Sequence, residues 1–201
     1  MNKLNLLLLI TILLLTIISC TSPSTENKAV GNQLSFIDST LHITSGNETL
    51  SVHLKSLGKY GYSLRARTSR AGKEITDFAF VLHYPVYHFE LADINREGRP
   101  DILLGVIKST HFDPVQRKRL FLYKIDNGRI RPLWMGSRIS HPIVDFRYKK
   151  INDHPYIITI EKENSNGYLV AEYEWKGFGL ELTKYIARNI NQDKSHEIFT
   201  K

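Results

Sequence analysis

The feature that most constrains this chain is a strand-and-turn pattern that occurs twice in its C-terminal half. The first copy can be set over the second at an offset of 57 residues, which falls to 55 and then to 49 further along. The matched pairs are Pro85 with Pro142, Phe89 with Phe146, Asn95 with Asn152, Pro100 with Pro155, Leu120 with Leu169 and Gly128 with Gly177. Repeats of roughly 20–50 residues indicate an array of one small unit, so this pattern decides the architecture.

Each copy contains four runs of strand length that are rich in β-branched and aromatic residues and are separated by turn residues. The predicted strands are 87–92, 102–107, 120–125 and 130–135 in the first copy, and 144–148, 156–160, 168–174 and 179–186 in the second. Asp126-Asn127-Gly128 is typical of a tight hairpin turn. Residues 34–84 fit a third and more divergent copy, with Gly72 in the place of Gly128.

These strands predict an all-β domain of antiparallel four-stranded repeats over residues 34–188, followed by a polar tail at 189–201. A unit of four antiparallel strands is the plan of a propeller blade, so the fold is expected to be propeller-like with about three blade-like units. Three units are fewer than the four to eight blades of a closed propeller. The sequence is therefore compatible with an open arc, a pinwheel-like variant or an unrelated sandwich. Only the residues after Tyr185 allow either a short helix or a frayed end.

The first twenty residues have the organisation of an export signal. Lys3 is followed by an apolar run over residues 6–18, which as a helix would rise only about 20 Å, too little to span a bilayer. Ile17-Ile18-Ser19-Cys20 comes next, and Cys20 is the only cysteine in the chain. This stretch resembles the lipobox of bacterial lipoproteins, which implies cleavage before Cys20 and lipidation of its thiol.

The lipobox resemblance implies a signal peptide at residues 1–19 and a protein that is anchored to a membrane of the cell envelope. Residues 20–33 are small and polar, so we expect a flexible tether between the anchor and the domain. Thr21 is not an obvious inner-membrane retention signal, and the outer membrane is therefore preferred over the inner one. A single cysteine excludes a disulfide framework, which leaves the hydrophobic core to stabilise the domain.

A polar loop separates the first two strands of the first copy. Its pattern is D-x-N-x-E-G-x-x-D from residue 93 to residue 101, directly before the apolar run ILLGV. This stretch resembles the FG-GAP/VCBS repeats of integrin-type β-propellers, in which such a loop binds calcium. The resemblance implies Ca²⁺ as a cofactor, with the ligands Asp93, Asn95, Glu97, Asp101 and the carbonyl group of Arg99.

The same loop also fits a hairpin turn without an ion. Asn and Asp side chains close turns by accepting hydrogen bonds from nearby backbone amides. Glu97 is longer than the usual Asp or Asn at its position, and Arg96 and Arg99 flank the site and could neutralise it. The second copy has Asn152-Asp153 in the corresponding turn without the acidic pattern, so both interpretations remain open.

The segment 107–119 is six residues longer than its counterpart in the second copy, which makes it the most divergent loop of the repeat. Because loops on a rigid scaffold carry function, we take it as a candidate ligand-binding segment. Its candidate residues are His111, Asp113, Arg117, Lys118 and Arg119. The alternative is a longer hairpin with a solvated basic end.

The charge and motif content favours a binding protein over an enzyme. The net charge of +7 suits an acidic partner such as an acidic glycan, and no nucleic-acid recognition motif is present in this exported chain. No nucleophile elbow or zinc-protease motif occurs, and Glu161 and Glu163 are interpreted as surface charges. The predicted function is binding of a protein or glycan partner at the envelope. An envelope or polysaccharide-processing hydrolase and a structural subunit of an envelope complex are the alternatives.

Overall fold

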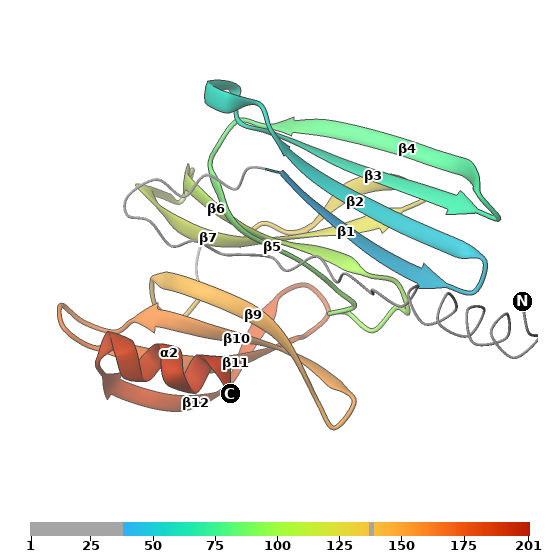
Figure 1. Ribbon diagram of the computed structural model, residues 1–201. Helices are drawn as coiled ribbons and strands as arrows, with labels where there is room; N and C mark the ends of the chain where they lie inside the picture. Colours follow the sequence, from blue (N-terminus) through green and yellow to red (C-terminus); the bar gives the residue numbers. More distant parts are fainter. Residues whose placement is uncertain (1–37, 137–138) are drawn as a thin grey trace, which may run out of the picture. The chain divides into compact units, whose positions relative to one another are not determined.

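The computed structural model describes residues 38–136 and 139–201, so the predicted signal peptide, Cys20 and the predicted tether lie outside the described residues. The described residues form three four-stranded antiparallel sheets (Figure 1). The first contains β1 (Asp38–Ser45), β2 (Glu48–Ser56), β3 (Tyr62–Arg70) and β4 (Lys73–Leu82), with the short 3-10 helix η1 (Gly58–Tyr60) after β2. The second contains β5 (Val86–Ala92), β6 (Asp101–Thr110), β7 (Asp113–Asp126) and β8 (Arg129–Trp134). The third contains β9 (Ile143–Ile151), β10 (His154–Lys162), β11 (Tyr168–Trp175) and β12 (Leu180–Ile190).

The strands of each sheet are hydrogen-bonded in the order in which they follow one another along the chain. Each sheet is therefore a meander of three hairpins, and the three sheets share one topology. This arrangement confirms the prediction of an all-β fold with about three blade-like units. It also shows that residues 38–82 form a unit of the same kind as the two copies found in the sequence.

The turn between the third and fourth strands contains a glycine with positive φ in all three sheets. Gly72, Gly128 and Gly177 have φ angles of 76°, 73° and 70°, the first two in two-residue turns and Gly177 in a longer turn. A tight hairpin needs a backbone in the left-handed region, which glycine adopts without a steric penalty. The match of Gly72 with Gly128 in the sequence therefore reflects one turn geometry repeated along the chain.

The three sheets differ in which of their faces are buried. In the first sheet, one face contributes Val52, Leu54 and Leu64 to the core, whereas the intervening residues of these strands are polar, which explains the period-two pattern. In the second sheet, both faces are buried. Leu104 packs with the residues of the first sheet and Leu103 with those of the third. The unbroken apolar run ILLGV in β6 follows from this double burial.

Gly105 in β6 allows β5 to pack closely against this run. A Cβ atom at residue 105 would lie 2.7 Å from the ring of Tyr87 and 2.8 Å from the Cβ of His88. Both contacts are too short for real carbon atoms, so a larger residue would force β5 away from β6. The glycine inside a strand is thus a packing requirement.

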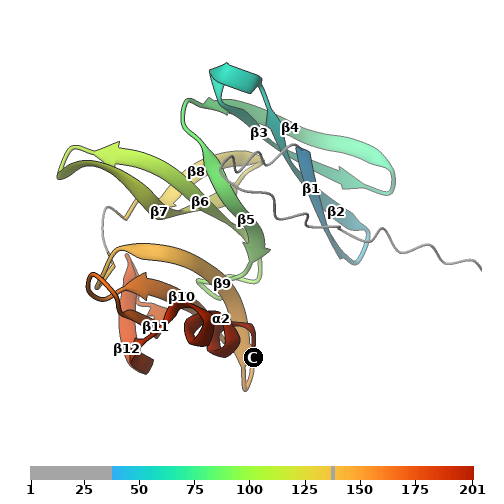
Figure 2. The same ribbon diagram turned by 60° about the vertical axis from the view of Figure 1, so that its left-hand side comes forward.

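The chain ends in α2 (Gln192–Thr200), which lies against the third sheet in both ribbon views (Figures 1 and 2). Asn191 caps this helix, because its side-chain oxygen accepts a hydrogen bond of 2.8 Å from the Lys194 amide. Phe199 of α2 is buried with Ile158, Ile160 and Val170 on the second face of the sheet. In the described part of the chain, no helix has the length and apolarity that a bilayer span requires.

A half-buried polar cluster joins the second sheet to the third. The ring of His88 on β5 lies between two carboxylates, with its Nδ1 3.1 Å from Asp145 Oδ1 and its Nε2 2.8 Å from Glu90 Oε1. The other oxygen of Glu90 accepts a hydrogen bond of 2.7 Å from the Tyr148 amide of β9. The same ring packs on Phe146, with 4.4 Å between the ring centroids. His88 therefore links β5 to β9 through both polar and apolar contacts.

Candidate functional site

The loop between β5 and β6 is closed by its own side chains. Asp93 Oδ1 accepts a hydrogen bond of 3.0 Å from the Glu97 amide, and Asp93 Oδ2 accepts one of 2.9 Å from the Gly98 amide. Asn95 Oδ1 also accepts from the Glu97 amide, at 3.1 Å. Gly98 and Arg96 both have positive φ, which these hydrogen bonds help to hold. Arg99 is exposed beside them.

Asp101 lies at the end of this loop and is buried, unlike the other acidic residues of the loop. Its Oδ2 accepts a hydrogen bond of 3.2 Å from the Ile94 amide. Burial raises the pKa of Asp101 to about 7, with hydrogen bonds from Ile94 and Asn95 opposing the rise and the charges of Asp93 and Glu97 adding to it. The three carboxylates therefore repel one another.

The oxygen atoms of this loop are chemically suitable for Ca²⁺, but its acidic side chains are not gathered around one point. Among residues 38–136 and 139–201, no group of three or more His, Cys, Asp or Glu side chains is arranged to hold a metal ion. The corresponding β9–β10 turn is closed by Asn152 and Asp153 at positive φ, with Asp153 paired to Lys150 at 2.5 Å. The two turns thus share a position in the fold but differ in acidic content.

The segment 107–119 is a hairpin extension, which corrects its interpretation as a loop. β6 continues to Thr110 and β7 begins at Asp113, so only His111 and Phe112 form the turn. The sequence predicts that one strand ends at residue 107 and the next begins at residue 120, because the basic run 117–119 is typical of a solvated loop. The pairing of Lys108 with Arg117 and of Val106 with Arg119 shows that this run belongs to the ladder.

Arg119 and Asp113 fix the shape of this hairpin. The Arg119 side chain is buried, and its Nη2 lies 3.1 Å from Asp113 Oδ2. Its Nε donates to the Lys108 carbonyl at 2.6 Å, and its Nη2 donates to the carbonyls of Asp113 and Val115 at 3.1 Å each. This guanidinium therefore holds both strands of the hairpin together.

The remaining predicted ligand-binding residues lie around this anchored pair. Arg117 Nε is 3.3 Å from Asp113 Oδ2, and Lys118 Nζ donates to the Val144 carbonyl at 2.8 Å. The ammonium of Lys118 also lies 4.4 Å from the centre of the Tyr87 ring. His111 is exposed at the tip and packs edge-on against Phe112. The structure thus brings Asp113, Arg117 and Arg119 together and places His111 apart from them.

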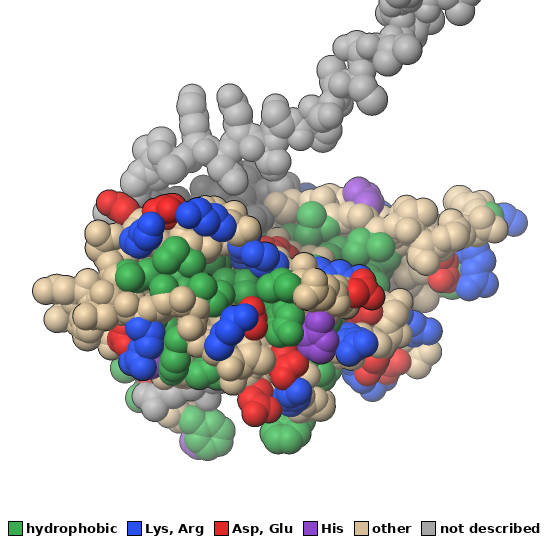
Figure 3. Space-filling view, turned by 90° about the horizontal axis from the view of Figure 1, so that it is seen from below, with side chains coloured by type: hydrophobic (Ala, Val, Ile, Leu, Met, Phe, Trp, Pro, Cys, Tyr) green, Lys and Arg blue, Asp and Glu red, His purple; other side chains and the backbone are tan. Residues whose placement is uncertain are grey.

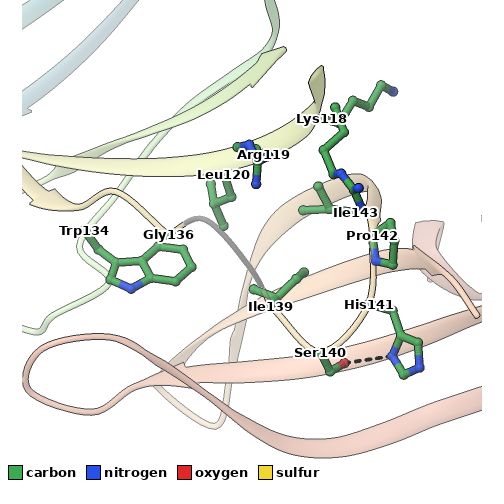
Figure 4. Close-up of a pocket in the computed structure, with 11 residues that line it drawn as sticks. Lys118, Arg119, Leu120, Trp134, Gly136, Ile139, Ser140, His141, Pro142 and Ile143 are labelled. Atoms are coloured by element: carbon green, nitrogen blue, oxygen red, sulfur yellow. Dashed lines mark hydrogen bonds between the residues drawn. The ribbon is translucent and has the colours of Figure 1, made fainter. Parts of the chain in front are cut away.

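Two cavities lie beside the hairpin, and we call them together the hairpin groove. The larger, of about 720 Å³, is lined by the β6–β7 tip together with Phe121, Trp134, Met135 and Gly136. The smaller, of about 280 Å³, shares Trp134 and Gly136 with it and extends to Ser140 and His141. Figure 4 shows Trp134 on one side of the smaller cavity and His141 on the other, with Leu120, Ile139 and Ile143 between them.

The hairpin groove combines exposed apolar side chains with positive charge. Phe112 at its rim is 87% exposed, and Met135 is also exposed. The basic side chains that line the two cavities are Lys108, Arg117, Lys118 and Arg119, and none of the described residues that line them is Asp or Glu. On the face seen in Figure 3, hydrophobic side chains lie among charges of both signs. The charged side chains among the described lining residues of the hairpin groove are all basic.

A buried carboxylate network lies behind the smaller cavity, and sequence reasoning missed it. Glu161 is 0% exposed, which corrects its interpretation as a surface charge. It accepts hydrogen bonds from Ser140 Oγ at 2.9 Å, from the His141 amide at 2.7 Å, from Thr159 Oγ1 at 2.6 Å and from Tyr173 OH at 2.8 Å. A carboxylate at the end of the apolar run of β10 is the only sequence signal of this site.

Ser140, His141 and Glu161 are not placed as a nucleophilic relay. In such a relay the acid contacts the histidine, and the histidine contacts the serine. Here Glu161 Oε2 is 2.9 Å from Ser140 Oγ but 3.7 Å from His141 Nδ1, so the acid bonds the serine directly. His141 Nδ1 lies 3.2 Å from the same hydroxyl (dashed line in Figure 4). The cluster fixes the approach of residues 139–143 to the third sheet.

Taken together, the sheets and the hairpin groove define an all-β protein of three four-stranded antiparallel units that carries a basic, partly apolar recess. No protein-family model matches the chain, and no curated protein matches it either. A solved structure, described as that of a Xanthomonas type IV secretion system related protein, is similar at 14% identity, with a TM-score of 0.42. The match covers 76% of this chain and 83% of the other. A likeness of this size carries no inference about function.

Proposed function

We propose that this protein is a lipid-anchored binding module of the cell envelope, which engages a protein or glycan partner through the hairpin groove. The observation that carries the proposal is the β6–β7 hairpin, which Arg119 ties together and which holds Phe112 87% exposed at the rim of a recess that carries positive charge. Exposed aromatic side chains on pre-organised elements are typical of binding surfaces, because little conformational entropy is lost on association.

Photocrosslinking in intact cells tests this proposal. With p-benzoylphenylalanine in place of Phe112, we expect a covalent adduct with a partner that is absent without light. The matched control is the same substitution at Ile75, which is also an exposed apolar residue but lies on β4 of the first sheet. Adducts of equal yield at both positions, or none at Phe112, would contradict a partner at this groove.

The proposed anchor is the lipidated thiol of Cys20, with the outer membrane as the proposed location. The apolar run before it, the serine at position 19 and its status as the only cysteine support this assignment. Several acyl chains, each contributing about 0.8 kcal/mol per buried CH₂, hold a protein at a membrane stably. We expect radiolabelled palmitate to enter the wild type and not Cys20→Ala. Equal labelling of the two proteins would rule the anchor out.

We further propose that the three sheets are divergent FG-GAP/VCBS-type repeats and that the loop at 93–101 binds Ca²⁺. The repeated sheet topology and the oxygen-rich loop support this proposal. A divalent cation would offset the repulsion that Asp93 and Glu97 exert on buried Asp101. Because three acidic side chains are not already gathered, binding has to close the loop around the ion.

Calcium is therefore expected to raise the melting temperature of the wild type but not that of Asp93→Ala. A ligand at tenfold its dissociation constant adds about 1.4 kcal/mol of stability, which corresponds to roughly 3–5 °C for a chain of this size. Differential scanning calorimetry with and without millimolar calcium measures the shift. Asn152→Ala in the β9–β10 turn is the control, and it should keep the calcium shift. If calcium leaves the melting temperature of the wild type unchanged, the calcium site is ruled out.

A further inference from the structure

We propose that β1 of the first sheet pairs with β1 of a second copy of this chain, so that the four strands of each copy join into one continuous sheet. This inference concerns a different sheet from the hairpin groove and does not depend on the proposed function. β1 is an edge strand, because among the described strands it is hydrogen-bonded to β2 alone (Figure 1). An edge strand presents a row of backbone amides and carbonyls with which a further strand can pair.

The other edge strands of the three sheets have features that oppose the addition of a strand. The pairing of β4 with β3 contains a bulge, and the pairing of β12 with β11 is irregular at three places. β8 contains Pro132, which has no amide hydrogen to donate. β5 and β9 lie against each other, and the Glu90 carboxylate accepts the Tyr148 amide of β9. Bulges, prolines and covering contacts are the devices by which proteins block an open edge.

β1 has none of these features. It pairs with β2 in one unbroken register over all of its length, and residues 39–45 contain no Lys, Arg, Asp, Glu, Pro or Gly. Its polar side chains bond to β2 instead of the open edge: Thr40 Oγ1 lies 2.9 Å from His53 Nδ1, and His42 Nδ1 lies 2.8 Å from Ser51 Oγ. Among the described residues, β1 therefore keeps a regular backbone edge that no other strand covers.

The sequence of β1 is complementary to itself. Residues 39–45 read Ser-Thr-Leu-His-Ile-Thr-Ser, so the same kinds of residue follow in both directions from His42. In an antiparallel pair with a two-fold axis at His42, each residue before His42 lies opposite the residue at the same distance after it in the second copy. Serine then meets serine, threonine meets threonine, and Leu41 meets Ile43 of the second copy. This register places like side chains together on both faces of the sheet.

The apolar residues of β1 would gain contacts from this pairing. Leu41 and Ile43 are only half-buried, although Leu41 packs against the core of the first sheet. In the paired state, each of the two side chains lies beside its counterpart from the other copy, which removes apolar surface from water. β1 of one copy thus completes the edge of the core that β1 of the other copy leaves open.

The backbone geometry of the hairpin fits the same register. Ser45 and Glu48 flank a two-residue turn, so a hydrogen bond joins them and the alternate residues of β1 face β2. The amide and carbonyl groups of His42 therefore face the open edge, where they would pair with those of His42 in the second copy. The joined sheet ends in β4 on both sides, and the bulge of β4 opposes further growth. The pairing therefore stops at two copies.

Disulfide crosslinking in membranes from cells that express the full-length chain tests this register. A cysteine in place of His42 would lie at the two-fold axis, where hydrogen-bonded strands hold opposite Cα atoms about 5.5 Å apart. A disulfide spans this separation, so we expect mild oxidation to convert His42→Cys into a linked dimer. The wild type, whose only cysteine is Cys20, measures the background.

Thr40→Cys and Thr44→Cys are matched controls on the same face of the same strand. In the proposed register each new cysteine lies about 13 Å along the strand from its own counterpart, which is too far for a disulfide. Each variant alone should therefore stay unlinked, whereas the two variants expressed together should form a mixed dimer. Equal crosslinking of the single variants, no dimer of His42→Cys, or its adduct with a different protein would overturn the proposal.

Sedimentation of the purified full-length protein in detergent provides a second test, which needs no new cysteine. His42→Glu places two like charges opposite each other at the axis, so the dissociation constant of the dimer should rise about tenfold or more. Ala79→Glu, at an exposed position of β4, is the control and should change it less than twofold. Circular dichroism spectra like that of the wild type would show that both variants are folded. A wild type that stays monomeric at all concentrations, or equal weakening in both variants, would contradict the pairing.

Discussion

The variant Glu161→Ala is expected to lose about 3–5 kcal/mol of unfolding free energy. The Glu161 side chain is fully buried and accepts hydrogen bonds from Ser140, His141, Thr159 and Tyr173. Truncation removes the acceptor of these donors and leaves a cavity at the same place. Because buried donors without a partner carry their full desolvation cost, the loss exceeds that of an ordinary hydrogen bond.

Urea unfolding followed by circular dichroism measures this loss. The control is Glu74→Ala, in which a carboxylate that is 56% exposed loses an ion pair of 3.6 Å with Arg67. This exposed pair contributes about 1 kcal/mol at most, so the control should unfold near the wild type. Glu161→Gln keeps the side-chain volume but places an amide NH₂ group among groups that already donate hydrogen bonds. We therefore expect it to lose most of the unfolding free energy that Glu161→Ala loses. A Glu161→Ala variant as stable as Glu74→Ala would show that the network does not stabilise the fold.

The second expected result is a loss of stability at alkaline pH that depends on His88. Burial disfavours the charged ring, but hydrogen bonds to Asp145 and Glu90 and their negative charges outweigh burial and raise the pKa of His88 to about 9. A histidine in the unfolded chain has a pKa near 6.5. The folded state therefore holds this proton more tightly, and the stabilisation is complete below pH 6.5 and disappears as the pH rises through 9.

The size of this effect follows from the two pKa values. A rise from 6.5 to about 9 corresponds to about 3 kcal/mol of unfolding free energy between pH 6 and pH 10. Asp101, whose pKa is raised to about 7, weakens the fold over a lower range, as the pH rises from about 4 to about 7. Lys118, whose pKa is lowered by burial, faces Asp145 in the same cluster. The difference between wild type and variant isolates the histidine from both.

Denaturant unfolding at a series of pH values between 6 and 10 checks this expectation. The wild type should lose stability across this range, whereas His88→Gln should be less stable at pH 6 and show a flatter profile. His83→Gln, at an exposed position before β5, is the matched control and should follow the wild type. Parallel profiles for wild type and His88→Gln would mean that the charged ring does not hold β5 to β9.

Much of the fold could be predicted because its signals are local. The turn residues Asp126-Asn127-Gly128 and the alternation of apolar residues in 50–54 act over a few positions, so they are visible without knowledge of the rest of the chain. The repeat also predicted the strand order, since two segments with the same turns at the same places form the same hairpins. The structure confirms that order and extends it to the first sheet.

The candidate site was much less predictable. The basic run 117–119 looks like a solvated loop, yet Arg119 is buried. Its partners are Asp113 and three backbone carbonyls of the hairpin, and these become close only when β6 and β7 pair beyond the core. Glu161 likewise looks like a surface charge, because its donors are spread from residue 140 to residue 173.

The sequence by itself determined the strands, their turns and the repetition of one four-stranded unit, because backbone preference and side-chain alternation are properties of neighbouring residues. Only the tertiary structure decided which faces of the sheets are buried, which charges are removed from water and where a recess remains. Burial and the pairing of charges depend on distances between residues far apart in the chain. A carboxylate such as Glu161 or a guanidinium such as Arg119 acquires its role only after the strands that carry its partners have come together.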